Sequence, residues 1–343
     1  MSDLLNQTQA ARDWADGAIR RHSGGVFGKL VPAVIWSDAR GDDGEPLVPV
    51  EPVELVARIN RIPHILLHNH DPGRPKGQVL EAANFATESG EKFVAAVLAY
   101  YAGGDVLDFR RLGVDANVSA APPSSLPAFP EGAWIQFGAD PNEVDSAWLD
   151  DVTSGAPLRV VRTELSHYAA DSTQELIRVG LVFLALVWNP FVTSIASEAG
   201  KNTYAAIHGW IRRLLERLAE RRNPILNIIA HQDGCQVSFL LRGKEVKQHY
   251  AAHDALPGAA AQAVQLIAKL KRRDMPVREL IYEFDKDALV WFPSYAVLDD
   301  NRIITDNTAL IAIEQLPTSL SLGVSRGEPL SPVVRSILEA DDA

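Results

Sequence analysis

Cysteine is almost absent from this chain, because its 343 residues include only Cys235. A single cysteine forms no internal disulfide, and such a sequence is typical of a reducing compartment. The first nine residues contain an acid and no apolar core, so they do not resemble a secretory signal. We therefore expect a cytoplasmic protein.

Positive charge is also scarce. Lys and Arg number 33 against 44 Asp and Glu, so the formal net charge is -11. Because nucleic-acid binding depends on clustered Lys and Arg, we expect no nucleic-acid partner. The phosphate-binding patterns G-x-x-x-x-G-K-[ST] and G-x-G-x-x-G are missing as well, and we expect no cofactor.

One long run, residues 179–197, lacks charged residues altogether. Its length of about 19 residues is close to the roughly 20 that cross a bilayer as a helix. Asn189, Pro190 and several hydroxyl residues dilute its second half, so we favour a buried helix kinked at Pro190. Membrane association through residues 179–197 is the alternative.

The chain does contain enough apolar residues for a large core. Hydrophobic residues make up 47% and charged residues 22%, which over 343 residues favours two domains. An N-terminal helix is predicted within residues 1–25, and a β-rich, barrel-like domain with mostly antiparallel strands over residues 26–140. Its predicted strands are 29–36, 47–53, 65–70, 77–85, 92–101, 114–119 and 134–137, and 53–60 is a candidate short helix.

A connector over residues 141–171 leads to an α+β domain over 172–330 and an acidic tail over 331–343, so the fold class is α+β. Ser172 and Glu175 have the spacing of a capping box, which predicts a helix from Ser172 to Gly200. This helix and the predicted helix 203–222 together form a long apolar helix pair. The other predictions are helices 141–151, 203–222 and 259–273, an edge strand 158–161, and strands 225–230, 236–241, 277–284, 289–298, 303–305 and 310–313.

Arginines cover one side of the predicted helix 203–222, opposite its apolar face. We interpret this side as a solvated face, with an anionic partner or lipid as the alternative. The arginines are Arg212, Arg213, Arg217, Arg221 and Arg222.

The densest chemistry lies in residues 62–77, which read I-P-H-I-L-L-H-N-H-D-P-G-R-P-K-G. A short apolar run ends in His68, Asn69, His70 and Asp71, and prolines and glycines then force a turn. If these residues form a strand, alternation places His68 and His70 on one face. Two imidazoles beside an acid fit a base with its orienting group, two metal ligands, or a structural hydrogen-bond cluster.

This stretch resembles the motif of the tailed-phage prohead (capsid-maturation) serine protease family. That family places its catalytic histidine in a run similar to L-L-x-N-H-D, followed by a turn and a Gly-x-Val strand. The resemblance covers about residues 26–140 and implies a small β-barrel, with His70 as the catalytic histidine and Gly77 as the glycine. It also implies a serine nucleophile on a later strand, for which Ser119 is the nearest match, although the glycines expected around that serine are absent.

The resemblance thus implies a prohead-protease-like serine peptidase acting on a protein or peptide, self-processing or degenerate, with an appended interaction domain. His70 would deprotonate Ser119, and His68, Asp71 or Asp140 would orient the base.

Other functions stay open. One is a non-catalytic protein-binding or membrane-associated module related to phage or to defence against phage. Another is a metal-dependent hydrolase using His68 and His70, because H-x-H-x-D also resembles the first metal motif of amidohydrolase-type barrels. Two further hypotheses concern Cys235, a candidate thiolate beside His231, and the acids around Glu283, which would collect a divalent cation.

Overall fold

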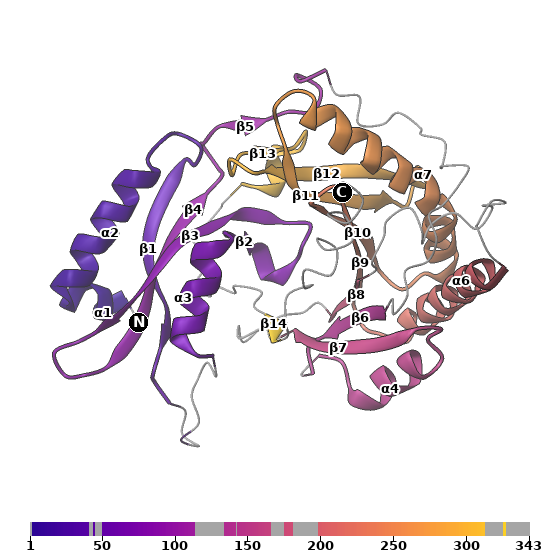
Figure 1. Ribbon diagram of the computed structural model, residues 1–343, viewed down its shortest axis with the longest axis horizontal. Coiled ribbons are helices and arrows are strands. Elements are labelled where there is room, and N and C mark those ends of the chain that lie inside the picture. Colours follow the sequence, from indigo (N-terminus) through magenta and orange to yellow (C-terminus); the bar gives the residue numbers. More distant parts are fainter. Residues whose placement is uncertain are drawn as a thin grey trace, which may run out of the picture.

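The computed structural model describes residues 2–40, 44, 50–113, 134–141, 143–165, 175–180, 198–312 and 325–326. Ser119, most of the run 179–197 and the tail 331–343 lie outside these residues, as do the predicted strand 114–119 and residues 47–49 of the predicted strand 47–53. The described part of that strand, residues 50–53, is not a strand, because Pro52 and Val53 begin a helix. The described chain has the predicted α+β composition, and its strands form one sheet of four and one sheet of ten (Figure 1).

The first sheet contains β1 (Lys29–Ser37), β2 (His64–Leu67), β3 (Pro75–Ala86) and β4 (Lys92–Tyr100). Its order is β1-β4-β3-β2, and all its neighbouring pairs are antiparallel, as predicted. Because β1 and β2 are its two edges, the described residues form an open sheet here, and not the closed barrel that the resemblance implies. Pro32 lies in edge strand β1, where a proline is tolerated because an edge N–H is not needed for the ladder.

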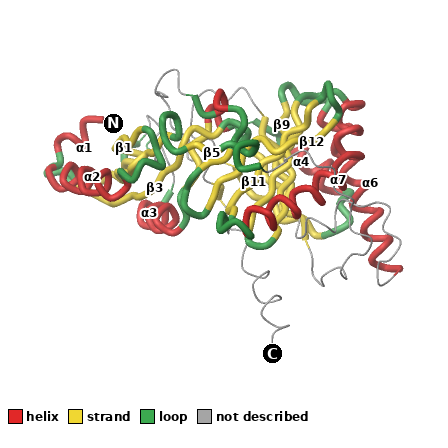
Figure 2. The backbone as a smooth tube through the Cα atoms, turned by 90° about the horizontal axis from the view of Figure 1, so that it is seen from above, coloured by secondary structure: helices red, strands yellow, loops and turns green. Residues whose placement is uncertain are grey.

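Helices cover both faces of this sheet. Helices α1 (Ser2–Gln7) and α2 (Gln9–His22) pack on one face, and α3 (Pro52–Arg61) packs on the other (Figure 2). Strand β4 is buried along its length after Lys92, because its alternate residues contact the two helix layers. The uninterrupted apolar sequence of β4 is typical of a strand covered on both faces.

The second sheet has the order β14-β7-β6-β8-β9-β10-β11-β12-β13-β5 and mixes parallel with antiparallel pairs. At its centre β9 and β10 form the predicted hairpin. Asp233 and Gly234 make its turn with φ of 54° and 80°, as two-residue hairpin turns require. The strands are β5 (Val106–Leu107), β6 (Trp134–Ala139), β7 (Arg159–Leu165), β8 (Glu175–Gly180), β9 (Pro224–Gln232), β10 (Cys235–Arg242), β11 (Val277–Asp285), β12 (Val290–Leu298), β13 (Ile303–Ile304) and β14 (Ser325–Arg326).

Three helices pack on one face of the second sheet: α4 (Ser146–Ser154), α6 (Glu198–Leu218) and α7 (Val246–Lys271) (Figures 1 and 2). The main core lies between these helices and the sheet. It contains Trp210 of α6, whose indole Nε1 donates to the carbonyl of Val152 in α4 at 2.8 Å.

The opposite face of the second sheet meets the first sheet. Leu240, Ile281 and Tyr295 on that face share a buried apolar cluster with Tyr101, and Ile65 of β2 packs against the cluster. The chain changes sheet between β4 and β5, because β5 already pairs with β13. The N-terminal sheet is therefore docked on the face of the second sheet that carries no helix among the described residues.

The helix predicted from Ser172 is wrong where the structure describes it, because residues 175–180 form β8, between β6 and β9. Leu176 and Ile177 are both buried and belong to clusters on opposite faces of the sheet. A strand buried on both faces reads as a continuous apolar run, which periodicity alone does not distinguish from a buried helix.

Other boundaries also differ from the predictions. Gly200 lies inside α6 and does not end a helix, and α7 extends the predicted helix 259–273 back to Val246. The predicted strand 310–313 is replaced, where described, by a 3-10 turn over Thr308–Leu310. A long apolar helix pair is absent from the described residues, and no described helix is long and apolar enough to cross a membrane.

The arginine face of α6 holds neighbouring helices instead of facing only solvent. Arg212 contacts Asp254 of α7 at 2.9 Å, and Arg217 contacts Asp151 of α4 at 2.8 Å. Each of these pairs is exposed and contributes little stability alone, about 0 to 1 kcal/mol. Together they set how α4 and α7 lie against α6.

The close approach of β3 and β4 at Gly77 gives a first prediction. A Cβ atom at Gly77 would lie 1.9 Å from the carbonyl oxygen of Ala99, so the strands would have to separate. We expect Gly77→Ala to lower the free energy of unfolding by about 1 to 3 kcal/mol in urea denaturation. Gly24→Ala is the control, because no atom lies within 4 Å of a Cβ there; equal effects of the two variants would contradict the packing argument.

Candidate functional site

The histidine stretch is a turn and not a strand. Strand β2 ends at Leu67, and His68–His70 form a 3-10 turn in which Asn69 has φ 50° and ψ 40°, the left-handed region. The N–H of His68 donates to the Arg74 carbonyl at 3.0 Å and the N–H of Asp71 donates to the His68 carbonyl at 3.0 Å, which closes the turn. The prediction that alternation places His68 and His70 on one strand face is therefore wrong. His68 is exposed, and the side chain of His70 is not among those described.

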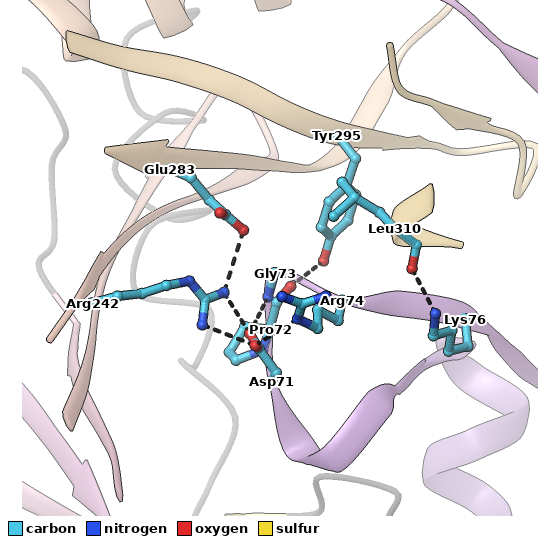
Figure 3. Close-up of polar contacts among 9 residues, drawn as sticks. All are labelled: Asp71, Pro72, Gly73, Arg74, Lys76, Arg242, Glu283, Tyr295 and Leu310. Atoms are coloured by element: carbon cyan, nitrogen blue, oxygen red, sulfur yellow. Dashed lines mark hydrogen bonds and ion pairs between the residues drawn. The ribbon is translucent and has the colours of Figure 1, made fainter. Parts of the chain in front are cut away.

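Asp71 lies at the centre of this turn with 1% of its surface exposed. Arg242 of β10 binds its carboxylate through two nitrogens, with Nη2 2.6 Å from Oδ1 and Nη1 2.8 Å from Oδ2 (Figure 3). The N–H of Gly73 also donates to Oδ1, at 2.9 Å, and Arg74 Nε lies 3.4 Å from Oδ2. Both carboxylate oxygens are thus occupied by donors, as a buried carboxylate requires.

Glu283 of β11 completes the cluster from the neighbouring strand. Its Oε1 accepts from Arg242 Nη2 at 3.3 Å (Figure 3). Burial raises the pKa of Glu283 above its usual value, and this outweighs the opposing effect of Arg242. Burial alone would lower the pKa of Arg242, but Asp71 and Glu283 together raise it, so the guanidinium stays charged. One arginine therefore links two acids, one from each sheet.

Other contacts hold the turn against the second sheet. A Cβ atom at Gly73 would lie 2.0 Å from Oε1 of Glu283 and 2.4 Å from Nη2 of Arg242, so a larger residue would displace the ends of these two side chains. The hydroxyl of Tyr295 donates to the Pro72 carbonyl at 2.7 Å, and Lys76 Nζ donates to the Leu310 carbonyl at 2.9 Å (Figure 3). We call residues 68–76 the docking turn, because its contacts join the two sheets.

A second polar contact between the sheets is centred on Gln78 of β3, which is fully buried. Its Nε2 donates to the Tyr101 hydroxyl at 2.7 Å and to the Asn301 carbonyl at 3.1 Å. Its Oε1 accepts from Arg278 Nη2 at 3.2 Å. The carboxamide therefore has donors and acceptors on both sides of the junction.

The predicted catalytic residues are not brought together where the structure describes them. The carboxylate of Asp71 is bound by Arg242, and Asp140 is buried at the end of β6, where its carbonyl accepts from the N–H groups of Glu143 and Val144. Ser119 lies outside the described residues. The local pattern drew attention to Asp71, but no sequence signal pointed to Arg242, which follows 171 residues later.

The metal and thiolate hypotheses find no support in the described residues. No group of three or more His, Cys, Asp or Glu side chains placed to hold a metal ion occurs among them, and Glu283 faces Arg242. Cys235 is fully buried, and burial raises the pKa of its thiol far above the usual value, so the proposed thiolate does not form.

The structure also reveals a histidine pair that the sequence pattern did not indicate. His208 of α6 and His253 of α7 are both buried, and Nδ1 of the first lies 3.1 Å from Nε2 of the second. Burial lowers the pKa of His253 below its usual value, with Arg212 acting in the same direction. Burial also lowers the pKa of His231 and of His64. The lowered pKa values favour the uncharged imidazole at neutral pH for His253, His231 and His64.

The shared carboxylate of the docking turn gives a second prediction. We expect Arg242→Gln to lower the free energy of unfolding by about 3 kcal/mol, because it leaves the buried Asp71 carboxylate without its bidentate partner. Asp71→Asn should cost about 1 to 3 kcal/mol, because Arg242 keeps Glu283 and its side chain is 33% exposed. The double variant should lose at least about 1 kcal/mol less than the sum of the two. Arg74→Gln is the matched control, since Arg74 also contacts Asp71 but is 55% exposed, and it should cost less than about 1 kcal/mol. Additive losses would show that Asp71 and Arg242 do not act as a pair.

The buried histidines give a third prediction, on pH. Their folded pKa values lie below the unfolded value of about 6.5. The unfolded chain therefore binds more protons as the pH falls through 6.5, and the free energy of unfolding should decrease from pH 7.5 to pH 5. We expect His253→Gln to reduce this dependence, with the exposed position His68→Gln as control. Equal slopes in urea melts of the parent and His253→Gln would contradict the assignment.

Comparisons of this chain with protein-family models, curated proteins and solved structures found no match. The described fold and the contacts of the docking turn therefore carry the functional argument. The resemblance to prohead proteases stays an expectation from the sequence.

Proposed function

We propose that this chain is a non-catalytic protein-binding module, in which residues 62–77 join two sheets and do not form an active site. The state of Asp71 supports this proposal most directly. A catalytic histidine needs an acid that accepts its ring N–H. Both carboxylate oxygens of Asp71, the acid next to His70, instead accept hydrogen bonds from Arg242, and Oδ1 also accepts one from the N–H of Gly73 in the turn.

The resemblance to prohead proteases suggests the class of partner. A relative of a peptidase that has lost its catalytic arrangement would still bind the kind of protein segment that the peptidase cleaves. We propose a protein of an assembling phage head as the partner, and the cytoplasm, where the single reduced cysteine is stable, as the site of binding.

The peptidase and the binding module are separated by a fluorophosphonate probe, which labels activated serines. We expect the parent protein to give only background labelling, equal to that of the Ser119→Ala and His70→Ala variants. The measurement is in-gel fluorescence, with a known serine peptidase as positive control. Labelling of the parent that disappears in both variants would overturn the proposal and establish His70 and Ser119 as a catalytic pair.

Binding itself is tested with purified phage scaffold and capsid-precursor proteins immobilised for surface plasmon resonance. We expect saturable binding that Ser119→Ala and His70→Ala leave unchanged, and no cleavage of either protein on denaturing gels. Cleavage products, or the absence of binding to every head protein tested, would contradict the proposed function.

A further inference from the structure

The pair of His208 and His253 lies at the contact between α6 and α7, on the far side of the second sheet from the docking turn. The two residues are 45 positions apart in sequence and lie on different helices. His208 is 7% exposed and His253 is 6% exposed. The two rings are 5.0 Å apart between centroids and inclined at 71°. Two ring nitrogens therefore face each other in a buried contact that the proposed function does not use.

The spacing of these nitrogens matches that of metal ligands. Two imidazole nitrogens that each lie about 2.0 to 2.1 Å from a tetrahedral zinc ion are about 3.3 Å apart. Nδ1 of His208 and Nε2 of His253 form a hydrogen bond of 3.1 Å. Once the proton of this bond has moved to the second nitrogen of its own ring, a small ring rotation would let both facing nitrogens bind one ion. Imidazole is the side chain that suits zinc, copper and nickel best among nitrogen ligands.

The surroundings of His253 add an independent observation. Its other nitrogen, Nδ1, is buried without a hydrogen-bond partner and lies 3.7 Å from Oδ1 of Asp254. Metal-binding histidines usually direct their second ring N–H at a carboxylate, which fixes the tautomer and leaves the first nitrogen unprotonated. Asp254 is itself held by Arg212 Nη2 at 2.9 Å, and the Arg212 guanidinium lies over the Tyr250 ring. A ring rotation that brings Nδ1 of His253 from 3.7 Å to hydrogen-bond distance of Asp254 would leave Nε2 as the ligating atom.

We propose that His208 and His253 form a two-histidine site for a divalent transition-metal ion, with Zn²⁺ as the first to test, which joins α6 to α7. Asp254 acts as a positioning residue for His253, and water completes the coordination. Because the ion binds the folded chain at a contact between helices, it should stabilise the fold in proportion to its concentration. This inference does not depend on the proposed function.

The test uses the full chain after removal of metals with a chelator. Titration with ZnCl₂ in a calorimeter should show one site, and the melting temperature should rise by several degrees at saturating zinc. His208→Gln and His253→Gln should each weaken the affinity more than tenfold, and Asp254→Asn by about 10- to 100-fold. His231→Gln is the control, because His231 is on β9 and should leave zinc affinity unchanged.

Asp254→Asn also guards against failure of the histidine variants to fold, because Asp254 is 63% exposed and its variant should fold. A merely structural histidine pair would show no zinc affinity for Asp254→Asn to reduce. Absence of zinc binding to the parent at millimolar zinc, or the same affinity in the parent and in the His208→Gln/His253→Gln double variant, would overturn the proposal.

Discussion

The ion pair between Asp71 and Arg242 is the interaction on which the arrangement of the two sheets depends. The Asp71 carboxylate is withdrawn from water at the junction, while the Arg242 side chain is 33% exposed, and a buried carboxylate is stable only if its oxygens are paired. The bidentate geometry fixes the direction of approach, since a planar guanidinium meets a carboxylate in one plane. Gly73 then allows the turn to touch Glu283, because a Cβ atom there would displace the carboxylate of Glu283 and the guanidinium of Arg242.

Apolar and polar residues make different contributions to the junction between the two sheets. Tyr101, Leu240 and Ile281 supply buried apolar surface, which favours contact without specifying its orientation. Asp71 and Gln78 supply directed bonds, and a different orientation would leave them unsatisfied at a cost of about 1 to 3 kcal/mol for each group. Asp71, one of the titratable residues that make the stretch look catalytic, therefore has a structural role in positioning one sheet on the other.

Polar and apolar contacts are also separated where α6 meets α4 and α7. The arginines of α6 contact acids on α4 and α7, while the apolar face of α6 packs in the main core. His208 and His253 lie between these two zones, below the surface and next to the pair of Arg212 and Asp254. A metal ion at that point would join helices that are otherwise held by packing and by weak surface pairs.

The sequence was enough to predict features that depend on near neighbours. The strands β1, β3, β4, β9, β10, β11 and β12 and the turn at Asp71–Gly73 were predicted, because turn residues and strand composition act over a few residues. The earlier end of β2 at Leu67 was not predicted. The site was predicted only as far as its location, since Asp71 was recognised as an important acid but its partner Arg242 was not.

Only the tertiary structure decided which strands share a sheet, that β8 is a strand, and that Asp71 is bound to Arg242. The physical reason is that a residue pattern reports how buried a segment is, while its partner is chosen by distant parts of the chain. A short segment such as residues 175–180, which reads E-L-I-R-V-G, satisfies a helix and a central strand equally well. Likewise, an aspartate beside a histidine is the same in sequence whether it orients that histidine or neutralises an arginine from another sheet.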